Sequence, residues 1–294
     1  MPVVKSIYDK KSRPLDNFIY ILIYFCAFIS IVLLAGIVGY VGYHGISSIN
    51  WKFLTTVPSA IKGTFGIAGN MINTLYIIII TLIISVPIGV GSAIYLNEYA
   101  KTGKLVNFIE FTTETLSGLP SIIFGLFGYV LFGQVLQLGY SILTGSLTLA
   151  IMVLPLITRN TQEALKAVPE SYRSGALGIG STKWYMIRTI LLPTAMPGVI
   201  TGVILSIGRI VGESAALLFT AGSGYLLPKM GQYGEGLFKK ILQAGGTLTI
   251  QLYLSMEKGE YDSAFGIAFV LLVLVFGINL LTKYLSNKFN NNKQ

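Results

Sequence analysis

Cysteine and histidine are nearly absent from this sequence, which has one of each, Cys26 and His44. A single cysteine cannot form an intrachain disulfide, and one histidine leaves too few soft ligands for a zinc site. The common signatures of enzymes are missing too, since no GxGxxG fingerprint, HExxH pair or GxSxG elbow occurs. We therefore expect a non-catalytic chain with no metal and no cofactor of its own.

Charged residues are scarce as well, at 11% of the chain against 53% hydrophobic residues, and the mean hydropathy is +0.71. A soluble domain of this length is rarely so apolar. Several apolar runs reach about 20 residues, the length that a helix needs to cross a bilayer. The sequence therefore predicts an all-α fold, a polytopic bundle of transmembrane helices.

Six apolar runs, separated by turns and charges, are long enough to span the membrane. They are Phe18–Tyr43, Met71–Leu96, Glu110–Phe132, Ile142–Ile157, Ala195–Thr220 and Ala264–Leu285. The short, glycine-rich boundary between the third and fourth, from Gly133 to Gly145, is also compatible with a re-entrant hairpin. The first run is too long for the core of a signal peptide, so we expect a retained helix.

The net charge of +9 arises from Lys and Arg in short loops, which is a topology signal rather than a nucleic-acid-binding surface. Of the 21 Lys and Arg residues, 14 fall on the side of the two termini and 6 on the other. Basic loops favour the cytoplasm, so we expect both termini there. The cytoplasmic segments are then residues 1–17, 97–109, 158–194 and 286–294, and the large outer loop is 221–263.

Arg209 lies near the middle of the fifth span, where an arginine costs about 3 kcal/mol on insertion scales. It should therefore face the bundle interior or a watery cavity. On a continuous helix, small and polar residues at spacings of four and three would form one stripe with it. That stripe is Gly202, Ser206, Arg209, Glu213, Ala216 and Thr220. Glu213, one turn further on, would lie within reach of an ion pair with Arg209.

Two interpretations of this stripe remain open. A guanidinium offers paired donors that match the oxygens of an oxyanion, so Arg209, Ser206 and Glu213 could line a substrate pathway. Alternatively, Arg209 and Glu213 form a structural ion pair that fixes the register of the helix.

A second group of residues lies on the predicted cytoplasmic side, in the segment PESYRSGALGIGSTKWYMIRTILLP from Pro169 to Pro193. Pro169 suits a first helical turn, Gly180 interrupts the helix, and Ser181 or Thr182 can cap a second one. We therefore predict two short helices around a glycine bend. They could dock into a groove of a partner or rest on the lipid surface. No P-loop is present, because Lys183 follows the Ser and Thr instead of preceding them.

This segment resembles the signature of ABC importer permeases, which reads EAA, three residues, Gly, nine residues and then I-x-L-P. The matching positions are Ser174, Gly175, Ala176, Gly180, Ile190, Leu192 and Pro193. The spacing is complete, but Ser174 and Gly175 differ from the family's first two residues. The stretches GLPSIIFGLFG (118–128) and GRIVGESAALLFTAG (208–222) are similar to the A-type permease of phosphate-specific ABC importers.

The resemblance implies a multi-pass protein of the bacterial inner membrane that takes part in ATP-driven phosphate import. Its permease core would cover residues 70–285, after a first helix and outer loop in 18–69. The signature positions would contact the ATPase, and the arginine at the position of Arg209 is associated in the family with phosphate translocation.

The resemblance also implies partners, namely a paralogous permease, a cytoplasmic ATPase dimer that holds the ATP, and an extracytoplasmic phosphate-binding protein. The outer loop 221–263 would be the landing surface for the last of these. Three alternatives stay open: a permease for molybdate or sulfate, an ATP-independent channel or carrier, and a membrane-embedded transferase. The transferase would need a carboxylate cluster that Glu110 and Glu114 alone do not make.

Overall fold

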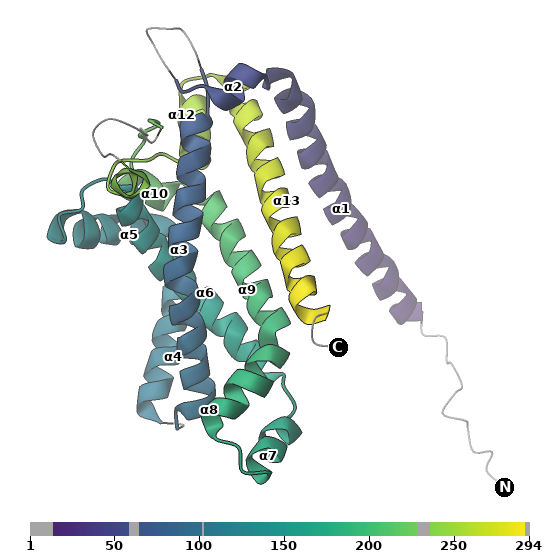
Figure 1. Ribbon diagram of the computed structural model, residues 1–294. Coiled ribbons are helices and arrows are strands. Elements are labelled where there is room, and N and C mark those ends of the chain that lie inside the picture. Colours follow the sequence, from purple (N-terminus) through teal and green to yellow (C-terminus); the bar gives the residue numbers. More distant parts are fainter. Residues whose placement is uncertain (1–13, 59–64, 102, 228–235, 292–294) are drawn as a thin grey trace.

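The computed structural model describes residues 14–58, 65–101, 103–227 and 236–291, and all regular structure in these ranges is helical (Figure 1). Three long helices form the centre: α3 (Ala68–Ile94), α6 (Ile142–Lys166) and α9 (Leu192–Gly212). At one edge, α1 (Pro14–Ser48) packs along α13 (Tyr261–Asn291). The predicted all-α helix bundle is confirmed.

Shorter helices lie at the two ends of this bundle (Figure 1). At one end, called the α12 end below, are α2 (Trp51–Thr55) and α12 (Leu248–Glu257). At the other, called the α7 end, are α7 (Glu170–Gly178) and α8 (Lys183–Met186). The remaining helices are α4 (Lys104–Ser117), α5 (Ser121–Gly128), α10 (Ala215–Thr220) and α11 (Leu237–Ile241). Three segments are π-helical: η1 (Tyr95–Tyr99), η2 (Tyr129–Val135) and η3 (Ile187–Leu191).

Five helical stretches of the described chain are long and apolar enough to cross a membrane, and a bent pair of helices raises the number to six. The five are Asn17–Ser48, Ala68–Tyr99, Ile142–Lys166, Lys183–Gly212 and Tyr261–Tyr284. The prediction of about six spans is confirmed. Several helices run past the predicted ends, since the polar turns beyond an apolar run can remain helical outside the hydrocarbon.

The predicted third span, Glu110–Phe132, is sharply bent. Lys104–Ser117 and Ser121–Val135 meet at an angle of 105°, and the break contains Pro120. A proline disfavours the helical conformation of the residue before it, so the first helix ends ahead of Pro120 and a new one begins after it. The change of direction lies at this break, upstream of the glycine-rich boundary from Gly133 to Gly145 that the sequence suggested.

The predicted fifth span, Ala195–Thr220, is also interrupted. α9 ends at Gly212, and Glu213 has an extended backbone with φ −84° and ψ 121°. The chain becomes helical again in α10. The stripe of small and polar residues is therefore not continuous, because Ala216 and Thr220 belong to a separate helix.

The core is built chiefly where α3 packs against α6. Close approach depends on Gly89, where a Cβ atom would lie 2.8 Å from Cγ2 of Ile157. In lipid the hydrophobic effect does not drive helices together, so this close packing has to supply the association. A second, smaller apolar cluster lies at the α7 end and joins Leu165, Ala176, Met186 and Leu191.

At the α12 end, two buried asparagines of α3 hold the segment that the sequence assigned to a loop. The Nδ2 atoms of Asn70 and Asn73 donate to the carbonyls of Gly246 and Gly224, each at 3.0 Å. Thr74 Oγ1 accepts from the backbone N–H of Leu248 at 3.0 Å. Backbone groups that are shielded from water must find partners inside the protein. The described residues of 221–263, which leave out 228–235, are thus largely packed structure, with α11, α12 and the start of α13 among them.

Candidate functional site

A cavity of about 500 Å³ lies between α4, α6 and α9, and reaches η1 at Leu96. Charged side chains from three helices line it: Glu110, Glu114, Arg159, Glu163, Lys166 and Arg209. Clustered charges inside a bundle indicate a wet, polar pathway rather than a lipid-facing surface. The sequence prediction that Arg209 faces a cavity is therefore confirmed.

The two arginines of this cavity differ in their partners. Arg159 forms ion pairs with Glu163 at 3.3 Å and with Glu114 at 3.7 Å, all through exposed side chains. Arg209 makes no ion pair or side-chain hydrogen bond with any residue in the part of the chain that the structure describes. Its guanidinium is free to bind water, an anion or another subunit.

Glu213 does not form the predicted pair with Arg209. It lies beyond the end of α9, is 9% exposed, and its Oε1 accepts the backbone N–H of Ala216 at 3.1 Å. A carboxylate in this position satisfies an open donor in the first turn of α10. The prediction of a common face and an ion pair is wrong, because the helix breaks between the two residues.

Ser206 is fully buried in α9, and its hydroxyl donates to the carbonyl of Gly202 at 2.8 Å. It does not line the cavity that contains Arg209. The structure thus separates the three predicted pathway residues, with Arg209 in the cavity, Ser206 in the core and Glu213 at a helix cap. Their roles in substrate passage stay predictions.

The two predicted short helices at the α7 end are present. α7 begins after Pro169, and Gly180 adopts the left-handed conformation with φ +85°. Thr182 caps α8 by accepting the N–H of Tyr185 at 3.3 Å. The chain then continues through η3 into α9, so α8 is joined without a loop to the helix that carries Arg209.

The signature positions divide into an outer and an inner group. Ser174, Gly175 and Gly180 are exposed, and Ser174 Oγ donates only to carbonyls of its own helix, at 3.2 and 3.3 Å. Ala176 is buried in the small apolar cluster, and Ile190 packs against it. Leu192 and Pro193 form the first turn of α9 and are half-buried. The inner residues hold α7 in place, and the outer ones leave a surface open for contact.

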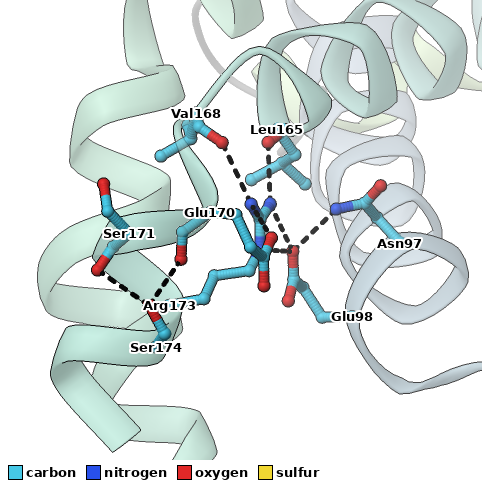
Figure 2. A network of polar contacts seen from close by, with 8 residues as sticks. All are labelled: Asn97, Glu98, Leu165, Val168, Glu170, Ser171, Arg173 and Ser174. Carbon is cyan, nitrogen blue, oxygen red and sulfur yellow. Dashed lines mark hydrogen bonds and ion pairs between the residues drawn. The ribbon is translucent and has the colours of Figure 1, made fainter. Parts of the chain in front are cut away.

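A buried ion pair fixes α7 to the rest of the α7 end (Figure 2). The Arg173 guanidinium lies 3.0 Å from Oε1 of Glu98, with the two side chains 14% and 4% exposed. It also donates to the backbone carbonyls of Leu165 at 2.8 Å and Val168 at 3.0 Å. Glu170 on α7 accepts from it at 3.2 Å, and Asn97 donates to Glu98 at 2.7 Å. One arginine thereby connects η1, the end of α6 and α7.

Most of the chain, residues 85–291, matches the family model described as binding-protein-dependent transport system inner membrane component. The chain is an ABC importer permease. The matched range runs from the second half of α3 to the end of α13, and so includes the cavity and α7. As in other such permeases, transport depends on a separate ATPase and a substrate-binding protein.

Curated relatives cover nearly the whole permease. A probable ABC transporter permease protein, YqgI of Bacillus subtilis, is 36% identical over 88% of this chain and 91% of its own length. The phosphate transport system permease protein PstA of Mycobacterium leprae is 30% identical over 91% of this chain and 88% of its own. The expected resemblance to A-type phosphate permeases is confirmed.

Among solved structures, a bacterial alginate ABC transporter in complex with a periplasmic protein shares the fold. Its TM-score is 0.67 over 94% of this chain and 96% of the other, at 13% identity. At that identity the likeness concerns the fold alone. Because that transporter is named for a polysaccharide, the fold by itself does not select the substrate.

Sequence reasoning missed the pair of Glu98 and Arg173. The two residues are 75 positions apart, and no periodicity connects them. A weak signal existed, since Glu98 follows directly on the end of a predicted span and Arg173 precedes the first signature position. Only the return of α6 to the α7 end brings them together.

Proposed function

We propose that this permease forms half of the pathway of an ATP-driven phosphate importer in the bacterial inner membrane. A paralogous permease would supply the other half, and a phosphate-binding protein would deliver the substrate from outside. The α7 end then faces the cytoplasm, where an ATPase dimer binds α7, and the α12 end receives the binding protein.

The observation that carries the proposal is the cavity with one arginine that forms no ion pair with any described residue. An oxyanion is the solute that such a guanidinium binds best, because two parallel N–H donors match two oxygens. Arg159 cannot bind an oxyanion in this way while it is paired with Glu114 and Glu163. The relatives named as phosphate permeases support phosphate over other oxyanions.

The coupling role of α7 is supported by its exposed surface. Leu177, Trp184 and Tyr185 are 49%, 60% and 58% exposed around the bend at Gly180. Large apolar side chains on a short, capped pair of helices are suited to a groove of another protein. Movement of the ATPase would pass through α8 and η3 directly into α9 and Arg209.

Uptake of radioactive phosphate into liposomes that contain the complete importer tests the proposal. We expect ATP-dependent uptake by the native complex and a loss of roughly 10- to 100-fold in Arg209→Gln, the effect of removing a charged hydrogen-bond donor. Arg209→Lys keeps the charge but not the fork, and should lie between the two.

Two controls sharpen this test. The amount of assembled complex, measured by size-exclusion chromatography, should be equal for all three proteins. Excess molybdate or sulfate added with the binding protein should not compete with phosphate uptake. Normal uptake by Arg209→Gln contradicts the role of the arginine, and competition by another oxyanion contradicts the choice of phosphate.

A further inference from the structure

The α7 helix has little apolar contact with the body of the permease. Of its nine residues from Glu170 to Gly178, only Ala176 is buried. A helix held by one small side chain can rock about that contact, since its remaining apolar groups point away from the protein. Another interaction has to fix its orientation.

Arg173 supplies that interaction on three sides (Figure 2). Nε and Nη2 donate to Glu98 at 3.3 and 3.0 Å, Nη2 to Leu165 O at 2.8 Å, and Nη1 to Val168 O at 3.0 Å. The Leu165 carbonyl lies in the last turn of α6 and the Val168 carbonyl two residues beyond its end, where the helix dipole is negative and favours a cation. Lysine could not make these contacts together, because its three donors radiate from one nitrogen.

The anchored ends also form part of the cavity wall. Leu96 lines the cavity two residues before Glu98, and Lys166 lines it next to Leu165. Any displacement of α7 that carries Arg173 with it therefore shifts both residues. Without Arg173, the same displacement of α7 would leave Leu96 and Lys166 in place.

We propose that Arg173, paired with Glu98, is a positioning residue that makes α7, η1 and the end of α6 move as one block. Motion of the ATPase then reaches the cavity through α3 and α6 as well as through α9. The inference rests on the proposed docking of the ATPase at α7, but not on the identity of the substrate.

Two measurements on the complete importer in liposomes test this role. The first is the amount of substrate imported per ATP hydrolysed. In Arg173→Met and in Glu98→Gln we expect this ratio to fall by about tenfold or more, since either change leaves a buried group without its charged partner. The rate of ATP hydrolysis itself should change little. Lys104→Met, at an exposed lysine of α4, is the matched control and should keep the native ratio.

The second measurement does not need transport. Spin labels on cysteines at Tyr95 and Tyr172, both about half exposed, report the distance between η1 and α7 in a Cys26→Ser background. We expect the distance to stay constant on ATP binding in the native complex and to change in both variants.

The outcomes separate the two proposals. A native complex that imports no phosphate contradicts the proposed substrate, while the label distances still decide on Arg173. A purely structural role would lower the yield of complex and leave import per ATP unchanged. That result, or a label distance that changes on ATP binding in the native complex, overturns the role of Arg173.

Discussion

At the residue scale, the charged side chains of the membrane helices differ in their partners. Arg209 has no described partner, Arg159 has two exposed carboxylates, and Glu213 caps a short helix. An exposed ion pair contributes about 0 to 1 kcal/mol, whereas an unpaired arginine within a span costs several times that. Arg209 avoids that cost by facing the cavity, where its guanidinium stays available for binding.

The cap at α10 gives a residue-scale prediction. Glu213→Ala removes the acceptor for the Ala216 N–H and should destabilise the protein by about 1 kcal/mol, the usual cost of a lost cap. Glu213→Gln keeps a side-chain oxygen and should cost less. The melting temperature of the purified permease complex, followed by intrinsic fluorescence, measures both.

The comparison between these variants is decisive for the role of Glu213. If the carboxylate instead neutralised Arg209, Gln and Ala would destabilise the complex equally. Equal melting temperatures for the two variants would therefore contradict the capping role.

At the scale of elements, the bend between α7 and α8 depends on Gly180. Its φ of +85° is a conformation that costs other residues roughly 1 to 2 kcal/mol. We expect Gly180→Ala to change the direction of α8 relative to α7 and to weaken binding of the ATPase. Retention of the ATPase by the immobilised permease, as salt is raised, measures this effect.

Gly178→Ala is the matched control for that experiment. Gly178 is the last residue of α7, has no positive φ, and has open space where a Cβ would be placed. The Gly178→Ala variant should bind the ATPase as the native protein does. Equal loss of binding in both variants would show that the bend is not the cause.

The element scale also shows what the sequence could and could not predict. Composition and run length gave the helix bundle, and local capping rules gave α7, α8 and the cap at Thr182. Pro120 is a residue type that bends a helix, but run length does not give the angle of 105° found there. The break at Glu213 was missed, because hydropathy does not register a change of direction. The Glu98–Arg173 pair was missed because it depends on tertiary contacts between distant segments.

At the scale of the whole molecule, cysteine labelling can measure which end of the permease faces the cytoplasm. The distribution of Lys and Arg predicts that α7 is cytoplasmic and α12 external. In a Cys26→Ser background, a cysteine at Tyr253 of α12 should react with a membrane-impermeant maleimide in intact cells, and a cysteine at Tyr172 of α7 should react only after lysis. Both side chains are about half exposed, so burial does not bias the comparison. The reverse pattern would contradict the proposed docking of the ATPase at α7.

The peripheral position of α1 bears on how the protein is made. α1 is synthesised before the other helices, and its main neighbour, α13, is synthesised after them. Its span has a mean hydropathy of 2.9, with none of its most apolar window buried by the rest of the chain. A helix that is apolar on every side is stable in lipid without a protein neighbour. During translation α1 can therefore lie in the bilayer without a protein neighbour. The fold is completed only when α13 has left the ribosome and packs against it.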